Sequence, residues 1–272
     1  MKNSTVDFSA PETSTNSTDM LIVRIAGLEI CVYSIYFLFG VPTHSYVIWL
    51  IVTGSSGVAS EFFNLNLSVC EIGNCLNCLI SSLSFYYLSI LPLKEFLVGL
   101  LATGRPLFQC LMCVERYLAV VHPVTFLKYK PLRYRVICCP VAWIIILFSC
   151  LFCLFTGGSY LLVETWFTLI QFLIFLSIQL FCLVAVLRAL KQSGPGERKK
   201  EENHMKRRAV NLILITTVFL VITYAPFSIS GIYTLLAKQY IFACWIPSLI
   251  CYVMTGFVQP ILYLHRAGKF SK

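Results

Sequence analysis

The chain contains seven apolar stretches, each long enough to cross a lipid bilayer as an α-helix. Stretches of roughly 18 or more apolar residues with few charges are typical of transmembrane helices. Of the 272 residues, 58% are hydrophobic and only 12% are charged, whereas a soluble domain carries about a quarter charged residues. We therefore predict an all-α membrane protein, a seven-transmembrane helix bundle. The predicted spans are residues 25–52, 62–91, 96–121, 136–155, 167–190, 209–233 and 241–264.

Basic residues gather on one side of this predicted bundle. Four lie in the loop 123–135, seven in 191–208 and three in 265–272, against four on the whole opposite side. Loops rich in lysine and arginine stay in the cytoplasm, so we predict that the N-terminus is outside. Residues 1–24 are then an extracellular segment, 25–264 the seven-transmembrane domain and 265–272 a short cytoplasmic tail. The net charge of +9 is explained by this topology. We therefore expect the chain to contact membrane lipid and not to bind nucleic acid.

Two glycosylation sequons lie in the predicted extracellular segment. Each reads NST, at Asn3 and at Asn16, within a stretch rich in serine and threonine that we predict to be disordered. A third sequon, NLS at Asn66, falls inside a span and is predicted to be unused. We therefore expect glycosylation at Asn3 and Asn16.

Five short motifs occur in order along the spans. They are NLSVCE at 66–71, ERY at 115–117, a single tryptophan in span four at Trp143, YAP at 224–226 and QPILY at 259–263. Together they resemble the corresponding motifs of the rhodopsin-like (class A) G-protein-coupled receptors. The continuation LAVVHP after ERY is most similar to the branch that holds nucleotide and protease-activated receptors.

This resemblance implies a multi-pass receptor of the plasma membrane that passes the binding of an unknown extracellular ligand to a heterotrimeric G protein. No Ser/His/Asp set, phosphate-binding loop or metal cluster faces a predicted aqueous site, so we expect neither a cofactor nor enzymatic activity. The residues that the resemblance assigns to G-protein coupling and to the conformational switch are Glu115, Arg116, Tyr117, Tyr224, Pro226, Gln259, Pro260 and Tyr263.

The physical chemistry of these residues fits a switch. Arg116 lies at the cytoplasmic edge of span three, where it can pair with Glu115 and swing to a new partner if the helix ends separate. The alternative is that Arg116 only anchors the helix at the interface. Pro226 and Pro260 each remove a backbone hydrogen bond, so we expect kinks that act as hinges.

Several positions depart from the family pattern. His44 stands where the family has asparagine, and we expect a buried neutral histidine that is hydrogen-bonded to a neighbour. Tyr224 replaces the usual tryptophan. The foot of span six carries Lys206, Arg207 and Arg208 instead of the acid that often holds the arginine of span three. We therefore expect that basal activity is not low.

Cysteines are numerous, but they do not form the family's outer disulfide. The loop 156–166 has no cysteine, and Leu91 stands near the position of the partner. The CLNC, CLMC and CLFC pairs lie within spans, where cysteine is more often a small packing residue than a metal ligand. We predict no metal site.

Two charges lie deep in the predicted membrane. Glu71 is on span two, on a face that also carries Asn64, Ser68 and Asn74 at helical spacing. Arg105 lies about 16 Å deeper than Arg116 at 1.5 Å per residue. Because an isolated ion at this depth is costly, we predict that Glu71 and Arg105 form a buried ion pair. In the family the acid of span two helps to hold a sodium ion, which this arginine would displace.

Two alternatives remain open. A non-signalling protein with the receptor fold is compatible with the altered motifs. A small channel or transporter could use Glu71 and Arg105 as part of a polar pathway, although such a path needs more polar lining than these spans provide.

Overall fold

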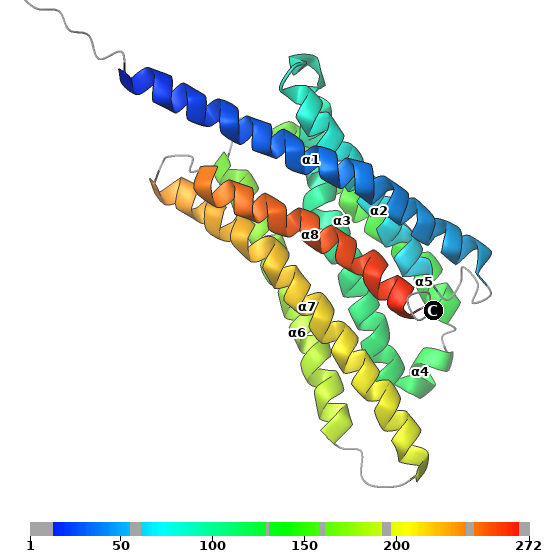
Figure 1. Ribbon diagram of the computed structural model, residues 1–272. Helices are drawn as coiled ribbons and strands as arrows, with labels where there is room; N and C mark the ends of the chain where they lie inside the picture. Colours follow the sequence, from blue (N-terminus) through cyan, green and yellow to red (C-terminus); the bar gives the residue numbers. More distant parts are fainter. Residues whose placement is uncertain are drawn as a thin grey trace, which may run out of the picture.

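The computed structural model describes residues 13–54, 61–128, 131–157, 161–191, 197–237 and 242–266. Its elements run along the chain in a single antiparallel series of helices (Figure 1). They are α1 (Thr13–Thr53), α2 (Phe62–Ser84), the 3-10 turn η1 (Leu88–Ile90), α3 (Leu91–Val121), α4 (Pro123–Lys128), α5 (Pro131–Thr156), α6 (Leu161–Lys191), α7 (Glu197–Ala237) and α8 (Phe242–Arg266).

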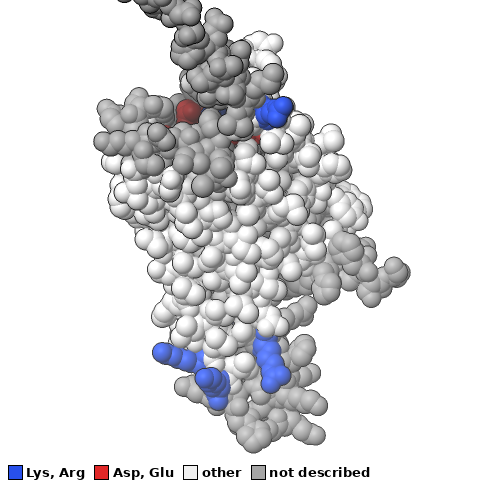
Figure 2. Space-filling model, turned by 60° about the vertical axis from the view of Figure 1, so that its left-hand side comes forward, with Lys and Arg blue, Asp and Glu red and all other residues white. Residues whose placement is uncertain are grey.

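Seven of these helices are long and apolar enough to cross a membrane, namely all the α-helices except the short α4. The described residues contain no strand. Figure 2 shows a broad middle zone without described charged side chains, with lysine or arginine atoms at both ends of the molecule. This zone is what a lipid-facing surface requires, since charges are costly in hydrocarbon. The predicted seven-helix all-α fold is confirmed.

Helix α3 forms the centre of the bundle. It packs against α2, α5, α6 and α7, while α1 lies on the outside against α2 and α8. The seventh span, α8, packs between α1 and α7. Side chains on α3 can therefore contact partners from most of the bundle.

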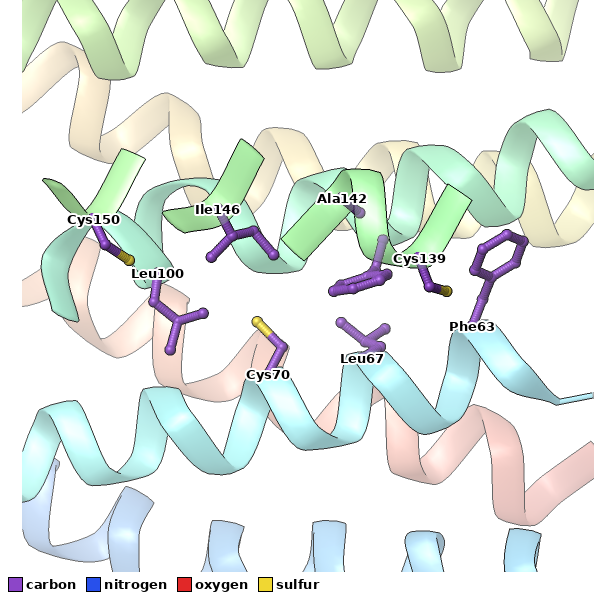
Figure 3. Close-up of a cluster of buried hydrophobic side chains, with 9 residues drawn as sticks. Phe63, Leu67, Cys70, Leu100, Cys139, Ala142, Ile146 and Cys150 are labelled. Carbon is purple, nitrogen blue, oxygen red and sulfur yellow. The ribbon is translucent and has the colours of Figure 1, made fainter. Parts of the chain in front are cut away.

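One apolar cluster joins α2, α3 and α5. Figure 3 shows Phe63, Leu67 and Cys70 of α2 directed toward α5, with Leu100 of α3 alongside them. Four residues of α5 complete the cluster, and three of them are the small residues cysteine and alanine, which let membrane helices approach closely. The residues from α5 are Cys139, Ala142, Ile146 and Cys150.

The closest approach between α3 and α5 is at Gly99. A Cβ atom placed on Gly99 would lie 2.4 Å from both the backbone N and the Cα of Cys150. Ser149 strengthens the contact by donating a hydrogen bond from its Oγ to the carbonyl of Gly99, at 3.1 Å. Only glycine fits here, because the obstructing atoms belong to backbone.

Gly99→Ala is therefore expected to destabilise the bundle by about 1–3 kcal/mol, the usual range for overpacking. Gly27→Ala in α1 is the matched control, because nothing lies within 4 Å of the Cβ position at Gly27. Thermal unfolding of both variants in detergent measures the difference. Equal melting temperatures would contradict the close approach.

Three helices begin furthest ahead of their predicted spans. Helix α1 begins at Thr13, so residues 13–24, predicted to be disordered, are helical; no proline or glycine interrupts them. Helix α6 begins at Leu161, within the predicted outer loop. Helix α7 begins at Glu197, because glutamate, lysine and arginine favour helix even outside the membrane.

The cysteines whose side chains the structure describes are all free thiols, and most are buried. The side chain of Cys244 lies outside that described set. No group of three or more His, Cys, Asp or Glu residues that could hold a metal ion occurs among the described residues.

Candidate functional site

A buried polar cluster lies at the centre of the bundle, on the face of α2 that the spacing predicts. Ser68, Glu71 and Asn74 are at most 1% exposed, while Asn64 is half-buried near the end of the helix. Asn74 donates from Nδ2 to Oε2 of Glu71, at 3.3 Å. The carboxylate of Glu71 therefore has no contact with the outside of the bundle, and its charge must be balanced by protein groups.

Arg105 of α3 provides that balance. Its Nε lies 2.5 Å from Oε1 of Glu71, and its Nη2 lies 2.8 Å from Oε2. The pair is bidentate, a geometry that the planar guanidinium matches well. The structure thus brings the two predicted residues together, and both are nearly inaccessible, at 2% and 1% exposed.

The remaining N–H groups of Arg105 bind two other helices. Nη2 donates to the hydroxyl of Tyr36 on α1, and Nη1 donates to the carbonyl of Tyr252 and to Oγ1 of Thr255 on α8, each at 3.0 Å. A guanidinium has five N–H donors. The two hydrogen bonds to Glu71 and these three use all five. The guanidinium carbon also lies 4.0 Å from the ring centroid of Tyr252, a cation–π contact.

Two further hydrogen bonds extend this cluster around Arg105, which we call the hub. Tyr36 donates to Oε2 of Glu71 at 2.6 Å, and Thr223 of α7 donates to Thr255 at 2.8 Å. Helices α1, α2, α3, α7 and α8 therefore meet in one hydrogen-bonded cluster. The sequence reasoning missed Tyr36, Tyr252 and Thr255. The only signal was that Tyr252 and Thr255, three residues apart, share one face of the seventh span.

His44 is fully buried, as expected. The neighbour that interacts with its ring is the backbone of Gly256 on α8, although neither ring nitrogen makes a well-formed hydrogen bond within the described parts of the chain. The expected hydrogen bond to a neighbour therefore stays a prediction.

A second site is a cavity at the end of the bundle where the ERY motif lies. It measures about 690 Å³ including its open mouth, and it lies between the ends of α2, α3, α7 and α8. Its lining includes four of the predicted coupling residues, Glu115, Arg116, Gln259 and Tyr263. Gln259 donates from Nε2 to Asn64 at 2.6 Å, which ties α8 to α2.

The carboxylate of Glu115 is held by a residue that the sequence reasoning did not predict. Nη2 of Arg135, near the start of α5, donates to Oε1 of Glu115. Arg116, the expected partner, lies beside it on the cavity wall. Tyr117 lies toward α6, with its ring centroid 5.7 Å from that of Phe181.

The YAP motif lies deeper, on α7. Tyr224 is 3% exposed, stacks on Phe172 of α6 and donates from its hydroxyl to the carbonyl of Leu101 on α3, at 3.2 Å. Pro226 and Pro260 both lie inside helices, α7 and α8 respectively. Pro226 lies two residues after Tyr224, which contacts α3, and Pro260 directly follows Gln259, which contacts α2.

Two other predicted features have clear positions. Trp143 of α5 donates from Nε1 to Oδ1 of Asn66 on α2, at 2.9 Å, so the third sequon faces a neighbouring helix. Asn16 lies within α1, but its side chain and those of Lys206 and Arg208 lie outside the described set. Asn3 lies outside the described residues altogether.

The geometry defines the chain as a seven-helix membrane protein with a buried charged hub and an open cavity at one end. No protein-family model matches the chain. It is 29% identical over 217 residues to chemokine XC receptor 1 of Mus musculus. The aligned region covers 74% of this chain and 65% of that receptor. The chain thus spans just under two thirds of that relative's length.

Two further relatives extend the similarity over more of the chain. Human chemokine XC receptor 1 is 27% identical over 267 residues, covering 88% of this chain and 77% of the receptor. The uracil nucleotide/cysteinyl leukotriene receptor of Mus musculus is 23% identical over 277 residues, covering 88% and 79%. The nucleotide branch is therefore present among the relatives, at lower identity than these chemokine receptors.

The chain is thus similar, at low identity, to rhodopsin-like (class A) G-protein-coupled receptors, the family that its motifs resemble, and its seven-helix fold agrees with theirs. It is a multi-pass protein of the plasma membrane. Its relatives are signalling receptors and not enzymes, which agrees with the prediction that the chain has no enzymatic activity.

Proposed function

We propose that the chain is a cell-surface receptor that converts the binding of an extracellular ligand into activation of a heterotrimeric G protein. The observation that supports this most strongly is the cavity in which Arg116 of ERY lies with Gln259 and Tyr263 of QPILY. Motifs more than 140 residues apart in sequence meet there at an open mouth. An inserted G-protein segment would contact the cavity wall.

The proposed topology puts this cavity in the cytoplasm and the N-terminus outside. The ERY end of α3 leads directly into the basic segment 123–135, and the basic foot of α7 lies on the same side of the bundle as the end of α8. Positive charge favours the cytoplasmic side. The same basic residues would form the surface on which the G protein docks.

Signal transfer would use the hub as the link between the two ends. The cluster around Arg105 joins five helices, and α7 and α8, which carry Pro226 and Pro260, are two of them. A ligand that binds two arrangements of these helices unequally shifts their populations. Movement of α7 or α8 at its proline would then widen or narrow the cavity around Arg116.

The names of the relatives suggest candidate ligands. They are receptors for chemokines and for uracil nucleotides or cysteinyl leukotrienes. The test is a panel of these ligand classes applied to cells that express the chain with reporters for each G-protein class. Activation of any reporter above that in vector cells supports the proposal. A properly exported chain that activates none of them would favour a non-signalling receptor fold.

The packing of the hub argues against a channel or transporter. A polar pathway would leave Glu71 and Arg105 in contact with water, yet they are 1% and 2% exposed, and their hydrogen-bonding groups are engaged by each other and by protein neighbours. An ionic current or substrate flux that persists without G protein would revive that alternative.

The proposed topology makes a separate prediction. Glycosidase treatment of the protein from cells is expected to increase its gel mobility, because Asn3 and Asn16 would face the lumen during synthesis. Asn3→Gln combined with Asn16→Gln should abolish the shift, while Asn66→Gln should leave it unchanged. An N-terminal tag that stains only after permeabilisation would overturn the topology.

A further inference from the structure

The described lining of the cavity at the ERY end includes two carboxylates, those of Glu61 and Glu115. The carboxylate of Glu115 is paired with Arg135 of α5. Glu61 directly precedes α2, and no lysine or arginine whose side chain the structure describes forms an ion pair with it. The cavity therefore contains a half-buried carboxylate whose charge no described cation balances.

Glu61 occupies the N-cap position of α2 but does not act as a cap. A capping side chain accepts a hydrogen bond from a backbone N–H in the first turn of the helix, and Glu61 makes no such bond. Its Oε2 instead accepts a hydrogen bond from Nδ2 of Asn64, and Oδ1 of Asn64 accepts one from Nε2 of Gln259 on α8, at 2.6 Å. All three residues line the cavity, so this ladder of hydrogen bonds holds the carboxylate on the cavity wall.

A protein segment that enters the cavity would remove water from this carboxylate. A carboxylate that is shielded from water without a cation is strongly unfavourable, whereas a lysine or arginine beside it restores the balance of charge. Much of the remaining wall is apolar and would contact apolar side chains of the segment. These wall residues are Phe63, Met112, Leu212, Ile213 and Leu262. The cavity therefore fits a segment that carries apolar side chains and a basic one placed opposite Glu61.

We propose that Glu61 recognises a lysine or arginine side chain on the segment of the G protein that enters the cavity. A segment with no basic residue at that place would leave the carboxylate shielded and unpaired, so Glu61 also disfavours the wrong partners. The inference rests on the proposed coupling function, which supplies the identity of the partner. The recognition itself, of a basic segment by a carboxylate, can be measured without activation of a G protein.

The first test measures the binding of synthetic peptides to the full chain in lipid nanodiscs. The probes are short fluorescent peptides that together cover the surface of one Gα subunit from each class. We expect that at least one peptide with a lysine or arginine binds the wild-type protein, and that Glu61→Gln weakens this binding about threefold, the size expected for a partly exposed ion pair. Glutamine keeps an oxygen acceptor for Asn64, so the ladder is retained. Glu61→Lys, which repels a basic peptide, should weaken the binding further.

Glu95→Gln is the matched control. Glu95 is also a half-buried glutamate, but it lies near the start of α3, at the opposite end of the bundle. The same change of charge there should leave peptide binding at the wild-type level. Equal weakening by Glu61→Gln and Glu95→Gln would mean that only the total charge of the chain matters, and it would overturn the proposal.

A double-mutant cycle identifies the pair. Each lysine or arginine of the bound peptide is replaced by glutamine in turn. At one position the replacement should weaken binding to the wild type but not to Glu61→Gln, because that variant lacks the carboxylate that the basic residue contacts. A glutamate at that position of the peptide should improve binding to Glu61→Lys. Equal losses in both proteins at every position, or the absence of any basic peptide that binds the wild type, would contradict the inference.

Nucleotide exchange on purified G proteins separates this inference from the proposed function. Glu61-dependent peptide binding by a chain that activates no G protein would retain the recognition of a basic segment and reject the proposed function. Activation that is unchanged in Glu61→Gln would retain the proposed function and overturn the role of Glu61.

Discussion

Glu71→Gln or Arg105→Met, each made alone, is expected to reduce the amount of folded protein sharply, and the double variant is expected to recover much of it. Removal of one member leaves the other charge buried without its partner, at a cost of roughly 3–5 kcal/mol. That cost is a large part of the stability of an ordinary protein. Fluorescence-detected size-exclusion chromatography of the four proteins measures the effect.

The saturation of Arg105 is the reason for this large effect. All five of its N–H groups have partners, and these come from α1, α2 and α8. Thr223→Val serves as a milder control, because it removes one hydroxyl hydrogen bond to Thr255 and should cost only about 1 kcal/mol. If the double variant is as poor as the sum of the single variants, the two charges do not stabilise each other.

The same geometry predicts that sodium does not affect the activity of the receptor. Both oxygens of Glu71 are engaged by Arg105, and Tyr36 donates to one of them as well. A free cation would have to displace the guanidinium to reach the carboxylate. Replacement of sodium by a bulky cation should therefore leave the activity of the receptor unchanged.

Arg116→Ala is expected to abolish G-protein coupling while surface expression stays near the wild-type level. Arg116 lines the open cavity that we propose as the G-protein site, so the variant removes a cation from the docking surface and leaves the buried hub intact. Arg188→Ala, at an exposed arginine of α6, is the control and should couple normally. Unchanged coupling in Arg116→Ala would mean that Arg116 only anchors α3 at the membrane interface.

The architecture was predictable because hydropathy reports directly on lipid exposure. Seven apolar stretches of sufficient length can only be satisfied as helices in a membrane, and the structure has seven such helices. The ends of α1 and α7 were not predictable from hydropathy. Residues 13–19 and 197–208 are mostly polar, and hydropathy cannot distinguish a polar helix from a polar loop outside the bilayer.

The centre of the site was predictable in part. Helical spacing on α2 and the cost of a buried charge indicate that Glu71 and Arg105 meet, because few other groups can balance an ion at that depth. Tyr36 and Tyr252 carry no such signal. A tyrosine in an apolar span can face either the lipid near the interface or the core of the bundle.

The partner of Glu115 on α5 could not be predicted from the sequence. Glu115 and Arg116 are adjacent, and their pairing stays a prediction, but a contact from another helix has no signal in the order of residues along α3. Arg135 reaches Glu115 from α5 because the short α4 brings the chain back beside α3. The partner of His44 carries no signal in the sequence either, because the group beside its ring is the backbone of Gly256 on α8.

We propose that the chain activates a G protein through the cavity around Arg116. The most direct test is guanine-nucleotide exchange on purified heterotrimeric G proteins of each class, with the chain reconstituted in lipid nanodiscs and a panel of candidate ligands. We expect that the wild-type protein accelerates exchange by at least one class above empty nanodiscs, and that Arg116→Ala removes the acceleration. A folded wild-type protein that accelerates exchange by no class with any ligand, or an Arg116→Ala variant that is fully active, would contradict the account.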